Sequence, residues 1–351
     1  MTTITLGSRV LGDGHPCFVI AEIGSNHDGD LATARALVDA AAAAGADAVK
    51  FQSFSVRGLY NLLSPNGDSA WAENPAISTL ERLELPPDWH AELAAHADSR
   101  GLLFLSTPFD EERLELLDRL KVPAIKVASG DLTHVPLLEA VGRTGRPVLL
   151  STGLGTLGEV EQAVGTIAAA AGWSRDAGWP IVLLHCVSSY PSRLPDANIR
   201  AMVTLRAAFG LHVGYSDHSP GHVVALGAVA LGARVIEKHL TLGRDRAGPD
   251  HSFALEPIEF GRMVADIREL EGALGDGAKR PVGAEVPERT WARRGLYARE
   301  TILRGTKITR HHVKVVRPCV GLEPAALDAI EGREATVDIP ADHPLAWELV
   351  R

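Results

Sequence analysis

Two histidines stand where their spacing could bring them to one divalent cation. His218 follows the apolar run 212–217, and His239 lies in the run 235–240. If these runs are neighbouring parallel strands, about 4.8 Å apart, both imidazoles can reach the same ion while water and substrate oxygens fill its other positions. Two neutral nitrogens plus oxygens suit Mn²⁺ or Mg²⁺, and the lack of a nearby cysteine disfavours structural zinc. The alternative is that these are ordinary hydrogen-bonded histidines.

Two lysines, Lys50 and Lys126, lie near the ends of other apolar runs. An inward-facing position would bury the ammonium, which costs several kcal/mol unless the group meets an anion. Hydroxyl groups are expected at neighbouring strand ends: Ser129, Ser151, Thr152 and Ser216. Ammonium and hydroxyl donors together favour a ligand that carries phosphate or carboxylate. An internal salt bridge with Glu22 or Glu237 is the alternative.

The elements that would position these side chains are eight strand-length apolar runs that alternate with amphipathic stretches of helical length. The runs are 17–24, 46–52, 102–108, 124–129, 147–152, 181–186, 212–217 and 235–240. Eight such runs over about 250 residues predict an α/β fold, a (β/α)₈ TIM barrel whose active face lies at the carboxyl ends of the strands. No GxGxxG motif follows the first run, which disfavours a dinucleotide-binding fold.

Segments outside this alternation suggest the domain organisation. Residues 4–14 predict a hairpin that caps the barrel floor, and the Pro-containing stretch 53–87 predicts a long loop over the active face. We expect a barrel domain over 1–274, a Gly- and Pro-rich linker over 275–289 and a small β-rich domain over 290–351. Within the last of these, the β-like pieces are GLYAR, VKVVRP and ATVDIP.

Composition and charge disfavour several classes of function. The chain has 351 residues, 46% of them hydrophobic, and a formal net charge of −9, which disfavours nucleic acid as a partner. No apolar stretch reaches the length of a membrane span, and Arg9 and Asp13 interrupt any signal-peptide core, so we expect a cytoplasmic protein without a membrane partner. Three widely spaced cysteines predict neither a disulfide framework nor a zinc ribbon.

Several ordered motifs resemble the sialic acid (N-acetylneuraminate) synthase family, whose members condense phosphoenolpyruvate with an N-acylated mannosamine-type sugar. The resemblance runs through nearly the whole chain. The motifs are AEIGSNHDGDLATARALVDAAAAAGADAVKFQ (21–52), STPFD (106–110), IKVASGD (125–131), STG (151–153), LLHCVSSYP (183–191), GYSDHSPG (214–221), EKHLTL (237–242) and GPDHSFALEP (248–257). The segment 298–321 resembles the family's C-terminal SAF domain, an antifreeze-like β-clip module.

The resemblance implies a transferase that uses Mn²⁺ or Mg²⁺ held by His218 and His239. It implies phosphoenolpyruvate-binding roles for Lys50, Lys126, Ser129, Ser151 and Ser216, with Thr107 beside them. It implies sugar-binding roles for Gln52, Asp131, Ser188, Tyr190 and Asp250, and a role near the reacting centre for Glu22. It also implies a domain-swapped homodimer in which Arg317 reaches from the SAF domain into the partner's barrel. A plain surface cation is the alternative for Arg317.

Two positions depart from members that make N-acetylneuraminate, which often carry Glu and Asn where this chain has Asp131 and Ser188. The acceptor therefore stays open between N-acetylmannosamine, a 2,4-diacetamido-trideoxy sugar and another aldose, including sugars of surface or spore-coat polysaccharides. A related synthase that uses a sugar phosphate is a further alternative, although no additional arginine cluster is evident for that phosphate. An inactive carbohydrate-binding or assembly protein is the alternative from another class.

Overall fold

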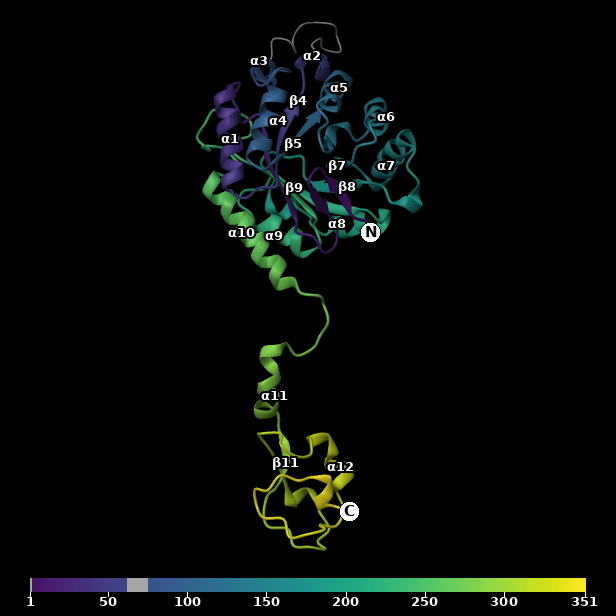
Figure 1. Cartoon of the computed structure of the whole chain (residues 1–351), viewed down its shortest axis with the longest axis vertical. Helices are drawn as coiled ribbons and strands as arrows, with labels where there is room; N and C mark the ends of the chain where they lie inside the picture. Colours follow the sequence, from purple (N-terminus) through teal and green to yellow (C-terminus); the bar gives the residue numbers. More distant parts are fainter. Residues whose placement is uncertain (1, 62–74) are drawn as a thin grey trace. The chain divides into compact units, whose positions relative to one another are not determined.

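The computed structural model describes residues 2–61 and 75–351 (Figure 1). The chain divides into two compact units, Met1–Gly275 and Asp276–Arg351. In the part of the chain that the structure describes, no helix is long and apolar enough to cross a membrane.

The first unit contains an eight-stranded parallel sheet with the order β5-β4-β3-β10-β9-β8-β7-β6. Strand β6 packs against β5, so the sheet closes on itself. The strands are β3 (Phe18–Gly24), β4 (Ala48–Ser53), β5 (Leu103–Pro108), β6 (Ile125–Val127), β7 (Val148–Ser151), β8 (Ile181–Cys186), β9 (His212–Asp217) and β10 (Val235–His239). Each coincides with one of the eight apolar runs, and the predicted (β/α)₈ barrel is confirmed.

Helices surround the strands (Figure 1). They are α1 (Leu31–Ala43), α4 (Trp89–Ser99), α5 (Glu111–Arg119), α6 (Val135–Arg143), α7 (Leu157–Ala171), α8 (Ala201–Phe209), α9 (Val223–Ala230) and α10 (Pro257–Leu274). The sequence explains where they begin: Asp30 and Asp110 cap α1 and α5 with side-chain acceptors, and Thr156 forms a capping box with Glu159 at α7. On α5, Leu114 and Leu117 are buried.

Side-chain alternation along the strands divides the core into two layers. Outward-facing positions such as Tyr215 and Ile236 pack between the barrel and its helices. Inward-facing positions such as Phe18 and Val235 fill the barrel near the amino ends of the strands. Because the amino end is filled, the open end of the barrel is the carboxyl end.

A hairpin of β1 (Ile4–Leu6) and β2 (Arg9–Leu11) packs its buried side chains into this inner layer. Leu6 and Leu11 are fully buried there, beside residues of the strand amino ends. The hairpin therefore covers the barrel floor, opposite the end that holds the candidate site.

The long connection after β4 differs from the loop expected over 53–87. Its described part forms two short helices, α2 (Val56–Leu59) and α3 (Pro75–Arg82), and the rest of that expectation lies outside the described residues. Phe54, Val56 and Leu83 form a small buried cluster under these helices. The loop prediction was therefore wrong for these helical residues, because their apolar side chains can be buried against each other.

The second unit is small and has its own core. Helix α11 (Val286–Ala292) lies across the expected boundary between linker and β-rich domain. Strands β11 (Gly295–Ala298) and β12 (Val313–Val316) pair antiparallel, and α12 (Leu327–Ile330) follows. The expected third β piece, ATVDIP, contributes single bridges, Ala335 to Val350 and Ile302 to Ile339, rather than a regular strand. Short bridged segments around a buried cluster give this unit its β-rich character.

Candidate active site

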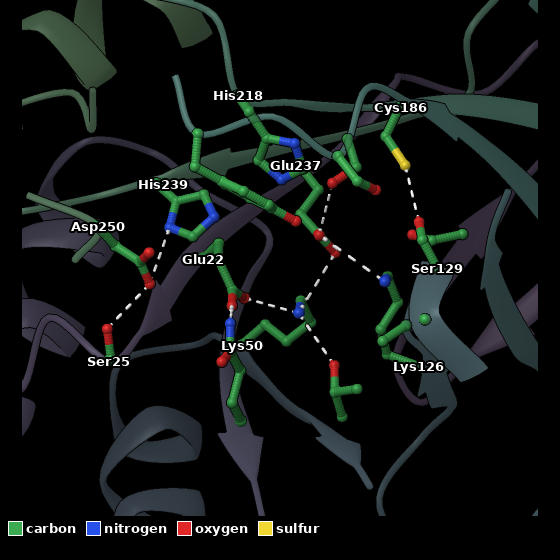
Figure 2. A pocket seen from close by; sticks show the side chains of 18 of the residues that line it. Glu22, Ser25, Lys50, Lys126, Ser129, Cys186, His218, Glu237, His239 and Asp250 are labelled. Atoms are coloured by element: carbon green, nitrogen blue, oxygen red, sulfur yellow. Dashed lines mark hydrogen bonds and ion pairs between the residues drawn. The ribbon is translucent and has the colours of Figure 1, made fainter. Parts of the chain in front are cut away.

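A cavity of about 470 Å³ opens at the carboxyl ends of the barrel strands (Figure 2). The site residues expected on the barrel line it, with the exceptions of Asp131 and Thr152. The expected residues that line it are Glu22, Lys50, Gln52, Thr107, Lys126, Ser129, Ser151, Ser188, Tyr190, Ser216, His218, His239 and Asp250. They come from seven of the strands and from connections that follow strands, among them the one after β8, so all eight strands contribute and only closure of the barrel brings these residues together.

Three expected residues lie elsewhere. Thr152 Oγ1 donates to the carbonyl of Leu184 at 3.2 Å and does not line the cavity. Asp131 ends the 3₁₀ turn Ser129–Asp131; it is buried but does not line the cavity, and burial raises the pKa of its carboxyl to about 6. Arg317 belongs to the second unit, where its side chain is exposed.

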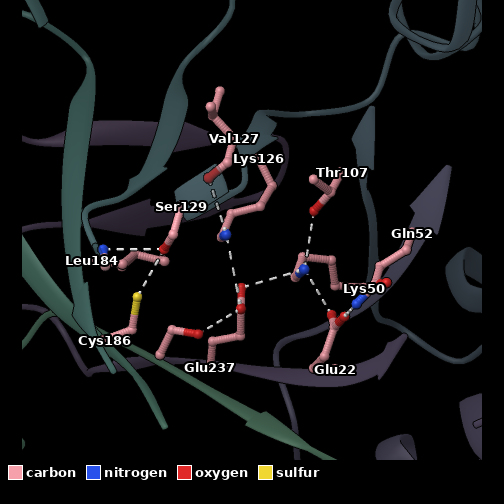
Figure 3. Close-up of polar contacts among 12 residues, drawn as sticks. Glu22, Lys50, Gln52, Thr107, Lys126, Val127, Ser129, Leu184, Cys186 and Glu237 are labelled. Atoms are coloured by element: carbon pink, nitrogen blue, oxygen red, sulfur yellow. Dashed lines mark hydrogen bonds and ion pairs between the residues drawn. The ribbon is translucent and has the colours of Figure 1, made fainter. Parts of the chain in front are cut away.

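One end of the cavity holds a buried cluster of opposite charges (Figure 3). The Lys50 ammonium lies 2.8 Å from Glu22 Oε2 and 3.7 Å from Glu237 Oε2, and it donates a hydrogen bond to Thr107 Oγ1. Burial by itself would lower the pKa of Lys50, but the two carboxylates outweigh burial and raise it. Lys50 is therefore a permanent cation inside the barrel.

Lys126 is less well compensated. Its Nζ lies 3.9 Å from Glu237 Oε1 and donates to the carbonyl of Val127. Burial lowers the pKa of Lys126, and the attraction of Glu237 offsets this only in part. The salt bridges expected as an alternative are thus present, yet Lys126 is the cation that would gain most from a bound anion.

Hydroxyl groups surround this cluster. Ser216 Oγ donates to Glu237 Oε1 at 2.9 Å, and Ser129 Oγ accepts from the Gly153 amide at 3.1 Å. Ser151 Oγ is buried and has no hydrogen-bond partner among the described residues. A buried hydroxyl without a partner costs free energy, so its presence in the same cavity as two ammonium groups favours an anionic ligand.

The two histidines meet at the other side of the cavity. The ring centroids of His218 and His239 are 5.5 Å apart. His218 Nδ1 lies 2.9 Å from the carbonyl oxygen of Val187 and donates to it, which leaves Nε2 as the free lone pair. Burial lowers the pKa of His218 to about 4 and also lowers that of His239, so both rings are neutral, as metal ligands must be.

This donor set fits a divalent cation held by two imidazoles. His239 Nδ1 has no hydrogen-bond partner among the described residues and lies 3.9 Å from Asp250 Oδ2. The described residues contain no group of three or more histidine, cysteine or carboxylate side chains placed to hold a metal. A cation here would therefore take its remaining ligands from water or substrate oxygens in the cavity, as expected for Mn²⁺ or Mg²⁺ at a catalytic site.

A backbone irregularity in β3 shapes the site. The pairing of β3 with β4 shifts register between Glu22 and Gly24, and Gly24 has a φ of +54°. A Cβ at Gly24 would come within 3.2 Å of Glu22, Gln52 and Asp250. Glycine suits this position because its φ lies in the left-handed region and three side-chain ends approach the place a Cβ would take.

Sequence reasoning gave no binding or catalytic role to three residues that line the cavity, and it expected one of them, Glu237, only as an alternative salt-bridge partner of the lysines. Glu237 compensates both lysines, Cys186 lies 3.1 Å from Ser129 Oγ, and Ser25 donates to Asp250 Oδ2 at 2.9 Å. The signal for Glu237 was its place two residues before His239, on the same face of one strand. The sequence carries no comparable signal for Ser25, because its partner lies 225 residues away.

Comparisons with known proteins identify the family and similar folds. The model of the NeuB family matches residues 37–279, and that of the SAF domain matches residues 293–351. The N,N'-diacetyllegionaminic acid synthase of Legionella pneumophila is 39% identical over 346 residues, which cover 97% of each chain.

Two solved structures are similar over most of their length. The N-acetylneuraminic acid (sialic acid) synthetase of Leptospira borgpetersenii has a TM-score of 0.74 at 36% identity, covering 82% of this chain and 95% of its own. The spore coat polysaccharide biosynthesis protein SpsE of Bacillus subtilis has a TM-score of 0.67 at 34% identity, covering 100% and 99%.

Proposed function

The chain belongs to the NeuB family, and from this premise we propose that it condenses phosphoenolpyruvate with an N-acylated mannosamine-type aldose. The products are a nonulosonic acid and inorganic phosphate. One observation carries the proposal: a single cavity combines two buried ammonium groups, a buried unpartnered hydroxyl and two neutral, adjacent imidazoles. The similar proteins named above as legionaminic and sialic acid synthases support the same reaction class.

Phosphoenolpyruvate would bind at the lysine end. Lys50 and Lys126 would hold its phosphate and carboxylate by charge-assisted hydrogen bonds, with Ser129, Ser151 and Ser216 as further donors. Glu22 and Glu237 already match the two ammonium charges, so the added negative charge of the ligand would also need the proposed divalent cation beside it.

The acceptor would bind at the histidine side. His218 and His239 would hold Mn²⁺ or Mg²⁺, which supplies Lewis-acid polarisation of the open-chain aldehyde. Gln52, Ser188, Tyr190 and Asp250 line the cavity and are able to bind sugar hydroxyl and acylamido groups. The aldehyde carbon would then lie between the two ends of the cavity.

The bonding changes follow from this placement. The C2=C3 double bond of phosphoenolpyruvate opens as C3 bonds to the aldehyde carbon. Water adds to C2, and one of its protons passes to the aldehyde oxygen, which becomes a hydroxyl. The C–O bond to phosphate then breaks, the hydroxyl on C2 gives its proton to the departing phosphate, and the ketone remains. Burial raises the pKa of Glu22, and Gln52 and Lys50 orient its carboxylate. Glu22 is thus suited to accept the proton that water loses.

We further propose a domain-swapped, cytoplasmic homodimer. In it, Arg317 of one chain would reach the acceptor in the partner's barrel. A guanidinium is a permanently charged, directional donor, and it suits the carbonyl oxygen of an acyl group.

The test is phosphate release from phosphoenolpyruvate by metal-stripped protein with a panel of acceptors. We expect release with an N-acylated mannosamine or a 2,4-diacetamido-trideoxy sugar after Mn²⁺ or Mg²⁺ is added, and none in excess chelator. His218→Ala and His239→Ala should each lower kcat/KM by about 10²-fold or more. Full activity in excess chelator would show that the reaction needs no cation. Phosphate release with another aldose alone would show that the chain is a synthase for a different acceptor.

A further inference from the structure

A fully buried ion pair lies outside the cavity, in the layer between the barrel and its helices. Lys238 Nζ lies 2.9 Å from Asp217 Oδ2, and both side chains have no exposed surface. The two residues are register partners of β10 and β9. Their outward-facing neighbours, Ile236 and Tyr215, belong to the apolar core, so this pair is set among hydrophobic side chains.

Each member of the pair directly precedes one of the two histidines. Because side chains alternate along a strand, Asp217 and Lys238 face outward while Glu237 and His239 face the cavity. His218 follows Asp217 and also lines the cavity. The ion pair therefore joins the two strand ends that carry the imidazoles.

The pair also fixes the turn that contains His218. Asp217 Oδ1 accepts hydrogen bonds from Ser219 N at 2.9 Å and Ser219 Oγ at 2.7 Å, and Lys238 Nζ donates to the carbonyl of Ser219. The carbonyl of His218 accepts from the amide of Ser192 at 3.0 Å. The backbone on both sides of His218 is thus held in one conformation.

A buried ion pair of this kind adds little to folding stability compared with apolar side chains of similar size, because desolvation cancels most of the attraction. Its hydrogen bonds nevertheless have fixed lengths and directions. We propose that Lys238 and Asp217 are a positioning pair that sets the spacing of His218 and His239, and so contributes to cation affinity more than to folding stability. This inference rests on the proposed function, in which the two histidines hold the cation.

The test replaces the pair by apolar residues in the full chain, Asp217→Leu with Lys238→Met. Mn²⁺ binding to metal-stripped protein is measured by isothermal titration calorimetry, and the melting temperature is measured without metal. We expect Mn²⁺ affinity to fall by at least about tenfold, as for other residues that orient metal ligands. The melting temperature should stay within about 3 °C of the wild type.

Ile236→Val is the matched control, because Ile236 is a fully buried outward-facing neighbour on the same strand. It should lower the melting temperature by about 2–4 °C and leave Mn²⁺ affinity unchanged. A second variant, Ser219→Ala, keeps the pair and removes one hydrogen bond of the turn, so Mn²⁺ affinity should fall by about threefold.

The outcomes separate the two proposals. If the wild type binds no Mn²⁺, the proposed cation site is wrong. If the wild type binds Mn²⁺ and the folded double variant binds it equally well, the positioning role is wrong. A double variant that does not fold would also overturn the inference, since the pair would then serve folding stability. Unchanged affinity in Ser219→Ala would contradict the role assigned to the turn.

Discussion

At the scale of single residues, the site depends on buried charges that compensate each other. Glu22 and Glu237 share the two ammonium groups of Lys50 and Lys126, and Lys126 has the weaker partner. Such a cluster can exist inside a barrel because each of the four charges has an opposite charge within 4 Å.

We predict that Lys126→Met raises the KM for phosphoenolpyruvate by about 30-fold or more, because a lost charge-assisted contact with phosphate costs about 2 kcal/mol. Lys50→Met should act in the same direction. The KM for the acceptor should change much less in steady-state kinetics. Lys307→Met changes an exposed lysine of the second unit and should leave both constants unaltered. A rise confined to the acceptor KM would contradict the assignment.

A second prediction concerns the pH dependence of stability. The native state raises the pKa of Asp131 from 3.8 to about 6 by burial, so it binds the proton more tightly than the unfolded chain. Ionisation of this carboxyl therefore lowers the free energy of unfolding as pH rises through about 4 to 6. Below that range the carboxyl is protonated in both states and does not change the free energy of unfolding. Asp131→Asn should raise the free energy of unfolding at pH 7.5 by about 1–2 kcal/mol, a figure reduced for solvent screening.

Urea unfolding at pH 7.5 and pH 4 checks this prediction, because the gain should vanish at the lower pH. Asp98→Asn, at an exposed position of α4, is the control and should be neutral at both. An equal effect of Asp131→Asn at the two pH values would show that ionisation of this carboxyl is not responsible.

At the scale of elements, the amino end of the barrel is filled with apolar side chains, and the carboxyl end holds the open cavity. The hairpin β1–β2 fills the floor with Ile4, Leu6 and Leu11, and the strand carboxyl ends carry the polar side chains. Stability and chemistry are thus placed at opposite ends of the same strands.

We therefore predict that Leu6→Ala lowers the free energy of unfolding by about 2–4 kcal/mol, because it removes a fully buried side chain and leaves a cavity. The KM for phosphoenolpyruvate should not change in the folded protein. Val10→Ala, on the other strand of the hairpin and 43% exposed, is the matched control and should cost less than about 0.5 kcal/mol. A changed KM in Leu6→Ala would mean that the floor and the site are coupled.

At the scale of the whole molecule, two units with separate cores make up the chain. Arg317 belongs to the second unit, whereas His218 belongs to the first. In a domain-swapped dimer, each site would combine one chain's barrel with the partner's second unit.

Mixing Arg317→Ala with His218→Ala chains tests this arrangement. Each variant should be nearly inactive alone, and mixed dimers should contain one intact site. With random exchange, phosphate release should approach about a quarter of the wild-type rate, since half the dimers are mixed and each has one good site of two. Absence of recovery despite measured subunit exchange would mean that Arg317 serves its own barrel or none.

The sequence by itself determined the strands, the barrel and most of the cavity lining. Strand ends are readable because apolar runs stop where polar side chains begin, and a closed parallel barrel must bring those ends together. The positions of Lys50, Lys126, His218 and His239 at the cavity follow from that rule.

Only the tertiary structure decided which of these groups face each other. Asp131 follows Ser129 by two residues, yet the turn between them directs it away from the cavity. Glu237 became the shared partner of two lysines, and Lys238 with Asp217 became a buried pair, because strand register and side-chain alternation set these contacts. Local sequence specifies where an element begins and ends, whereas contacts across the barrel depend on how distant strands align.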